Sequence, residues 1–137
     1  MTIPTIPAGS VLRVQGEEGP IPIPFDAVMA YHGHGALAML ALVFQGLRGA
    51  LARLEAGGDP VPRSELSVVS GHPGPGVRDA FEFVTRAVTR GCYQVDLSLP
   101  EARYSAAADK SYSFWLRRGD RAAVSYTHLT LPTSDLV

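Results

Sequence analysis

Three histidines of this 137-residue chain lie in glycine-rich segments, each just before an apolar helical pattern. His32 and His34 belong to "YHGHGALAML", and His72 belongs to "SGHPGPGVRD". Neutral imidazole is the commonest metal ligand near neutral pH, and glycine lets the backbone bend closely around a ligand. In an extended His-x-His segment both rings would project to the same side. We therefore predict that His32, His34 and His72 hold one divalent metal ion, with zinc as the first expectation.

The same residues have plainer interpretations. A lone His-x-His pair can serve in helix capping or packing, and His72 can be a hydrogen-bonded loop histidine. The glycines of "GHPGPG" could instead form a nest of backbone N–H groups for phosphate. Against this, two prolines remove donors, and the segment lacks the Gly-Lys-Ser/Thr of a P-loop. These alternatives remain open at the level of sequence.

Neighbouring side chains could assist such a site. Tyr31 could orient a substrate oxygen, although an aromatic there more often packs in the core. Asp79 could accept a hydrogen bond from a ligand histidine, but we prefer the interpretation that it places a favourable charge in the first turn of a helix. Glu82 and Asp79 are candidates for a general base only by proximity in sequence, so the pattern does not decide whether the protein is an enzyme. Cys92, the single cysteine, is interpreted as a small buried side chain.

The elements that must position these residues follow from apolar periodicity and from glycine and proline. We expect helices at 25–30, 36–54 and 76–90, and strands at 66–69, 93–99 and 111–116. Gly119 and Asp120 should form the tip of a hairpin. The predicted class is α+β, in the order α-β-α-β-β(-β), with the helices on one face of a mostly antiparallel or mixed sheet. Residues 1–24 read as a proline- and glycine-rich segment with a short extended piece at 11–14.

Composition excludes several classes of function. The formal net charge is −1, which argues against a nucleic-acid surface or a polybasic membrane anchor. All but one of the 12 basic residues are arginine, which we interpret as genomic composition bias. The longest apolar run, 36–44, is much shorter than the ~20 residues of a membrane span, and no secretion signal is visible. We expect a soluble, cytoplasmic protein.

The end of the chain has a different character. The stretch "VSYTHLTLPT", residues 124–133, can be encoded by the reverse complement of a widely used transposase-type sequencing adapter. We therefore interpret 124–137 as an adapter-derived tail, leave it out of the domain and give His128 no role. An ordinary C-terminal strand is the alternative. On the adapter interpretation the natural protein is truncated after the domain at 25–123.

Three segments together resemble a known family. "PFDAVMAYHGHGALAMLAL" resembles the N-terminal motif of the formylmethanofuran dehydrogenase E-subunit-like proteins, which pair an aromatic residue with His-Gly-His. "VVSGHPGPGVRDAFEFVTRAV" is similar to the second glycine-rich turn and helix of that family, and "YSFWLRRGDRAA" to its closing strand pair. The resemblance covers about 24–123. It departs from the family where Ala36 replaces a cysteine and Leu37-Ala38 replace Pro-Gly.

The resemblance implies an α-β-α-β-β-β domain that binds metal. His32 and His34 match the motif histidines, and His72 lies where many relatives have a cysteine. The implied function is a divalent-metal-binding domain, either a metal-dependent enzyme or an accessory component of a one-carbon or redox complex. The alternative is a non-catalytic subunit or homo-oligomeric interaction domain without metal, which would pack through the small residues Gly46, Gly49 and Ala50. Neither function calls for nucleic acid or a membrane.

Overall fold

The computed structural model describes residues 10–33, 35, 37–99 and 111–128. Its elements are, in chain order, β1 (Val11–Gly16), β2 (Gly19–Pro24), α1 (Phe25–His32), α2 (Leu37–Leu54), the 3₁₀ turn η1 (Arg63–Glu65), β3 (Leu66–Ser70), α3 (Pro75–Thr85), β4 (Tyr93–Val95), β5 (Ser111–Arg118) and β6 (Arg121–His128). Among the described residues, no helix has the length and apolar composition that a bilayer span requires.

The main sheet has four strands in the order β4-β3-β5-β6. β3 pairs with β4 in parallel, whereas β5 is antiparallel to both β3 and β6. The β5–β6 hairpin turns at Gly119 and Asp120, as predicted, and Gly119 has a φ of 61°, in the left-handed region that glycine adopts most easily. The sheet is therefore mixed but mostly antiparallel.

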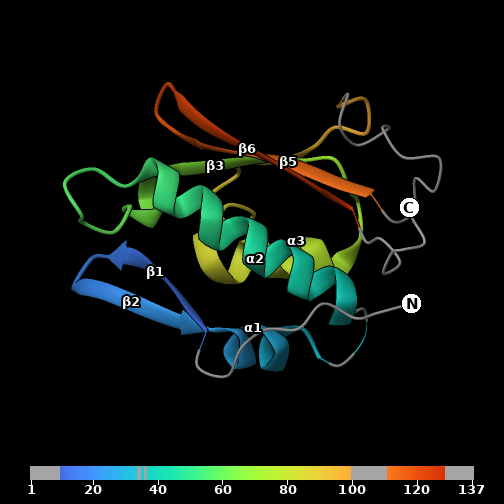
Figure 1. Cartoon of the computed structure of the whole chain (residues 1–137), viewed down its shortest axis with the longest axis horizontal. Coiled ribbons are helices and arrows are strands. Elements are labelled where there is room, and N and C mark those ends of the chain that lie inside the picture. Colours follow the sequence, from blue (N-terminus) through green and yellow to red (C-terminus); the bar gives the residue numbers. More distant parts are fainter. Residues whose placement is uncertain (1–9, 34, 36, 100–110, 129–137) are drawn as a thin grey trace, which may run out of the picture.

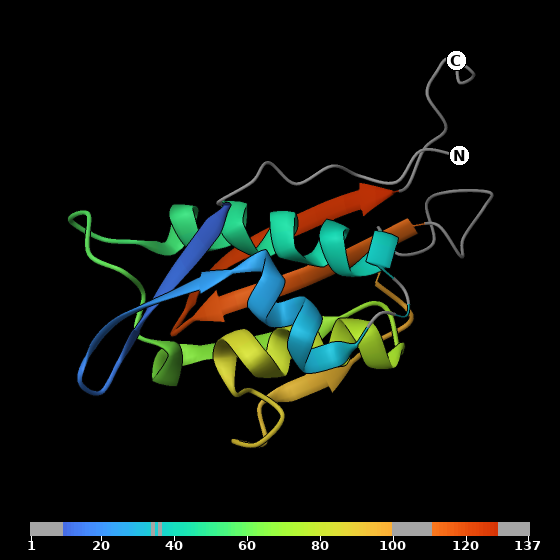
Figure 2. The same cartoon turned by 90° about the horizontal axis from the view of Figure 1, so that it is seen from below.

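Two layers lie on one side of this sheet. Figure 1 shows α2 and α3 beneath the sheet, with α1 and the β1–β2 hairpin below these two helices. The view from below in Figure 2 shows α1 crossing between α2 and α3. The predicted α+β class, with helices on one face of the sheet, is confirmed.

The core lies between the sheet and the helices. The apolar stripe predicted for α2 is buried along its length, at Leu40, Val43, Phe44, Leu47, Leu51 and Leu54. From α3, Phe81 packs edge-on against Phe114 of β5, with ring centroids 4.9 Å apart. Such contacts fix α3, and with it the turn before it, against the centre of the sheet.

A hairpin near the N-terminus differs from the sequence prediction. The composition of residues 1–24 predicts a proline- and glycine-rich segment with a short extended piece at 11–14. That piece lies within β1, but β1 and β2 together form an antiparallel hairpin that pairs Val14 with Ile21 and Leu12 with Ile23. Only alternate residues of a strand direct their N–H groups to a given neighbour. Prolines at every second position of β2 therefore leave the isoleucine N–H groups available to β1, and proline is compatible with an edge strand.

The helix predicted at 76–90 is shorter than expected. α3 ends at Thr85, and Arg86 takes a left-handed conformation with φ 59°. The Thr85 hydroxyl donates to the Phe81 carbonyl oxygen (2.7 Å) and accepts the Ala87 N–H (3.1 Å). The Glu82 carboxylate accepts the N–H (3.0 Å) and the hydroxyl of Thr89. These local side-chain bonds turn the chain before the apolar pattern ends.

Other boundaries also differ. The strand expected at 93–99 spans only Tyr93–Val95, because the chain turns at Asp96, whose carboxylate accepts the Ser98 N–H at 3.0 Å. β5 is longer than the strand predicted at 111–116, and β6 includes residues 124–128 of the tail. Any extended segment with this alternation can pair in the same way. The adapter interpretation of the tail therefore stays a prediction.

Candidate functional site

His32 and Asp79 form the centre of the candidate site. His32 is the last residue of α1, and Asp79 lies on α3, 47 residues further along the chain. The Nδ1 atom of His32 is 2.8 Å from Oδ2 of Asp79, and the two side chains are 12% and 31% exposed. The packing of α1 against α3 thus joins the two glycine-rich regions that the sequence placed at one site.

Gly33 explains part of the His-Gly-His pattern. It ends α1 with a φ of 103°, and its N–H donates to the Met29 carbonyl oxygen at 2.8 Å. A residue with a side chain would be strained in this conformation. The expectation of an extended His-x-His segment is wrong at His32, which is helical. Its ring is placed by the helix end rather than by a strand.

The contact with Asp79 determines which nitrogen of the neutral His32 ring carries the proton. A carboxylate can only accept hydrogen bonds, so Nδ1 of His32 is the donor. In the neutral ring the lone pair is then on Nε2, the arrangement found when a carboxylate orients a metal-ligating histidine. The preferred interpretation of Asp79 as a first-turn charge is wrong. α3 begins at Pro75, its first turn contains no acidic residue, and Asp79 binds His32 instead.

His72 forms hydrogen bonds within its own loop. Its Nδ1 atom accepts the Gly74 N–H at 2.9 Å, and its own N–H donates to the Ser70 hydroxyl at 3.2 Å. A Cβ on Gly74 would lie 2.7 Å from Cε1 of the ring, so the loop closes tightly around the imidazole. Burial lowers the pKa of His72, which favours the neutral ring. With Nδ1 accepting, the proton of that ring is on Nε2, which leaves no free lone pair for a metal.

His72 therefore matches the hydrogen-bonded loop histidine of the plainer interpretation. His34 and Ala36 lie outside the described residues. Within the described ranges, no three His, Cys, Asp or Glu side chains come together as a metal-binding group. The ligand role of His32 and His34 stays a prediction, whereas the hydrogen bond from the Gly74 N–H argues against His72 as a ligand.

Tyr31 lies beside this pair but belongs to another surface. Its ring is tilted against Phe83, with centroids 5.0 Å apart, and 51% of the residue is exposed. It lines a hollow of about 490 Å³ together with Arg63 and Arg86. This position suits contact with a bound molecule better than a role in the core.

The remaining candidates have structural partners. Glu82, considered as a general base, caps the end of α3 through Thr89. Cys92 is half-buried, and its thiol donates to the Leu66 carbonyl oxygen at 3.5 Å, in agreement with its interpretation as a packing residue. Ala50 is fully buried in the core, so the proposed interaction face of Gly46, Gly49 and Ala50 is not one surface.

Sequence reasoning missed a second site. A cleft of about 690 Å³ lies between the β1–β2 turn, η1 and the end of α3, and Arg63, Arg86 and Arg90 line one part of it. Arg86 and Arg90 lie four residues apart after α3, but Arg63 comes from a separate part of the chain, and no sequence pattern links it to them. We interpret the many arginines as genomic composition bias, and that interpretation does not predict that these three lie around one cleft.

Comparison with protein-family models, with curated proteins and with solved structures gave no match. The resemblance to the formylmethanofuran dehydrogenase E-subunit-like proteins is thus a prediction from the quoted motifs.

Proposed function

We propose that this chain is a divalent-metal-binding domain in which the His-Gly-His segment supplies the ligands. The observation that carries the proposal is the 2.8 Å contact between His32 Nδ1 and Asp79 Oδ2. It supports the proposal because a histidine with its Nδ1–H bound to a carboxylate presents Nε2 as a more basic and better oriented ligand.

The three predicted histidines do not suit a metal ion equally well. His32 fits a metal through Nε2, and His34, one residue beyond Gly33, is the second ligand of the proposal. His72 does not fit, because its Nδ1 lone pair is occupied by the Gly74 N–H. The proposed protein ligands are therefore His32 and His34, with Asp79 holding the His32 ring. A zinc ion bound there would supply Lewis acidity toward an oxygen-containing ligand.

The chain's own residues would define the surroundings of that ion. Asp79 keeps the proton of His32 on Nδ1, and its negative charge favours a nearby cation. The His72 loop provides a rigid turn immediately before α3, which carries Asp79. The alternative function, an interaction domain without metal, is less well supported. Its predicted contact face includes Ala50, which is buried in the core.

Metal content tests the proposal. We would measure it by elemental analysis, on wild-type protein and the variant His32→Ala/His34→Ala, both purified without added metal and after reconstitution with zinc. The proposal predicts bound divalent metal in the wild type and its loss in the variant. Circular dichroism would show that the variant is folded. A wild-type protein that takes up no metal even after reconstitution would overturn the proposal.

A further inference from the structure

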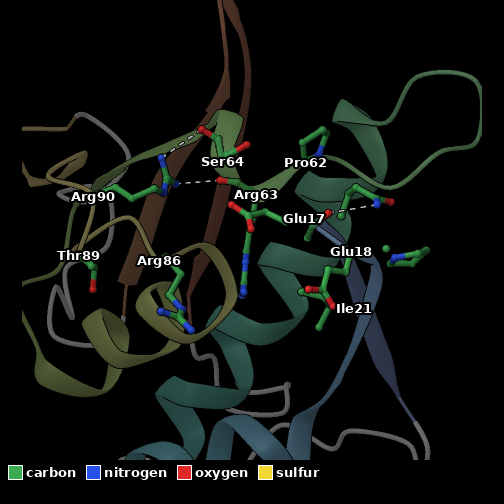
Figure 3. Close-up of a pocket in the computed structure, with 13 residues that line it drawn as sticks. Glu17, Glu18, Ile21, Pro62, Arg63, Ser64, Arg86, Thr89 and Arg90 are labelled. Atoms are coloured by element: carbon green, nitrogen blue, oxygen red, sulfur yellow. Dashed lines mark hydrogen bonds between the residues drawn. The ribbon is translucent and has the colours of Figure 1, made fainter.

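The cleft between the β1–β2 turn and the end of α3 has the size of a small-molecule site. Its volume of about 690 Å³ lies within the range of ~300–1,000 Å³ that is usual for such sites. Figure 3 shows the Arg63 side chain crossing the middle of the cleft, with Arg86 on one side and Glu18 and Ile21 on the other. Chain segments far apart in sequence thus meet around one hollow.

Arg63 and Arg86 bring positive charge to this cleft, and the carboxylate of Glu82 is close enough to interact electrostatically with both. Arg63 is half-buried in η1, and Arg86 follows α3. Among the residues that the structure describes, neither guanidinium forms an ion pair or donates a hydrogen bond. Burial lowers the pKa of Arg63 and the nearby cations of Arg86 and Arg90 lower it further, whereas the carboxylate of Glu82 raises it.

Arg90 differs from the other two. Its guanidinium donates to four carbonyl oxygens: those of Arg63 (2.9 Å), Ser64 (3.3 Å), Leu66 (2.7 Å) and Thr85 (2.9 Å). These bonds tie η1 and the start of β3 to the end of α3. Arg90 is therefore a brace that fixes the two elements from which Arg63 and Arg86 project, as the dashed lines of Figure 3 show in part.

The backbone of Arg86 is strained at the same place. Arg86 is the only described non-glycine residue with a positive φ, at 59°. The left-handed conformation costs a residue with a side chain about 1–2 kcal/mol, and glycine or asparagine usually takes this position after a helix. The chain instead places an arginine there, beside the cleft.

The rest of the lining defines the shape of a ligand. Ile21 and Pro62 give the cleft an apolar wall. Ile21, Arg63 and Arg86 also line the neighbouring hollow of about 490 Å³ that contains Tyr31 and Phe83. Glu17 and Glu18, both exposed at the β1–β2 turn, lie across the cleft from Arg86 and would repel an extended polyanion. The lining therefore suits a compact molecule with one anionic end and an apolar body.

We propose that this cleft binds a small organic oxyanion, with the guanidinium groups of Arg63 and Arg86 as its anion ligands and with Ile21 and Pro62 against its apolar part. Guanidinium matches both carboxylate and phosphate, because its N–H groups can donate two parallel hydrogen bonds to either. The site is separate from His32 and Asp79, which do not line the cleft. It therefore stands whether or not the chain binds metal.

Calorimetric titration with phenyl phosphate and with benzoate tests the proposal and distinguishes the two anion classes. The variants are Arg63→Gln and Arg86→Asn; asparagine tolerates the left-handed backbone and lacks the guanidinium. Arg48→Gln is the control, since Arg48 is an exposed residue of α2 outside the cleft. Each cleft variant should weaken binding roughly tenfold or more, the loss of one charge-assisted contact, and Arg48→Gln should not.

Binding should also weaken as salt is added. The probe that binds the wild type more tightly identifies the anion class. Absence of binding by both probes at millimolar concentration would overturn the proposal, and so would binding that Arg63→Gln and Arg86→Asn leave unchanged. Unfolding temperatures of the unliganded variants close to that of the wild type would show that the loss is local. Unchanged metal content in Arg63→Gln would separate this site from the histidine site.

Discussion

Asp79 of α3 accepts a hydrogen bond from Nδ1 of His32 at the end of α1, at 2.8 Å. This bond joins the two regions that the sequence marked as chemically unusual. In the neutral ring it also places the proton of His32 on Nδ1, so that the lone pair of Nε2 is available for other chemistry.

Asp79 should control metal affinity without being a ligand. Asp79→Ala removes the hydrogen bond that orients His32, and loss of such a partner typically weakens metal binding about 10–100-fold. Competition against a chromophoric chelator would measure the change. Asp26→Asn, an exposed carboxylate at the other end of α1, is the matched control and should bind zinc as the wild type does. Equal affinities for Asp79→Ala and the wild type would refute the role of Asp79.

His72 should make stability depend on pH. Burial lowers the pKa of His72 in the folded state below that of the unfolded chain, so the unfolded state binds more protons between the two values. Stability should therefore fall as the pH drops below the unfolded value of about 6.5. His72→Asn should reduce this fall, because asparagine can accept the Gly74 N–H without titrating. Thermal unfolding of both proteins across this pH range would measure it, and identical profiles would contradict the prediction.

Arg90 should matter for stability more than its surface position suggests. Arg90→Gln removes charge-assisted bonds to four carbonyl oxygens and should lower the free energy of unfolding by about 1–3 kcal/mol. Urea denaturation would measure the loss. Arg48→Gln should change stability by less than about 0.5 kcal/mol, as usual for an exposed residue. If the two variants were equally stable, Arg90 would not be a brace.

Phe81 should be a dominant core residue. It is fully buried and contacts Phe114 and Tyr93, so Phe81→Ala should cost about 3–5 kcal/mol. Phe83 on the same helix is only partly buried against Tyr31, and Phe83→Ala should cost clearly less. The same denaturation experiment compares them, and the reverse order would contradict the packing described for α3.

The sequence predicts what depends on local pattern. The spacing of Leu40, Leu47 and Leu54 identifies α2, because a buried helix face repeats every three to four residues. The hairpin at Gly119 follows from turn chemistry. In contrast, β2 escapes prediction because its prolines suggest irregular chain, and only its pairing with β1 shows that they occupy tolerated positions. The end of α3 depends on capping by Glu82 and Thr85, which an apolar pattern does not contain.

The candidate site is predictable in part. His32 and Asp79 both stand out in the sequence, but their contact depends on how α1 packs against α3, and this is not encoded in the spacing of either segment. The glycine-rich surroundings of His72 suggest a metal ligand. The same glycines allow a tight loop in which the Gly74 N–H donates a hydrogen bond to Nδ1 of His72. Arg63 and Arg86 cannot be linked from sequence at all, because their proximity arises only from the tertiary fold.

The most direct test of the metal site compares zinc affinity in His32→Ala and His72→Asn. If His32 is a ligand and His72 a loop residue, His32→Ala should lose most of its affinity for zinc, while His72→Asn should bind it as tightly as the wild type. Equal loss in both variants would restore His72 to the ligand set and contradict the assignment of its lone pair. Wild-type affinity in His32→Ala would contradict the central claim that Asp79 prepares His32 to bind metal.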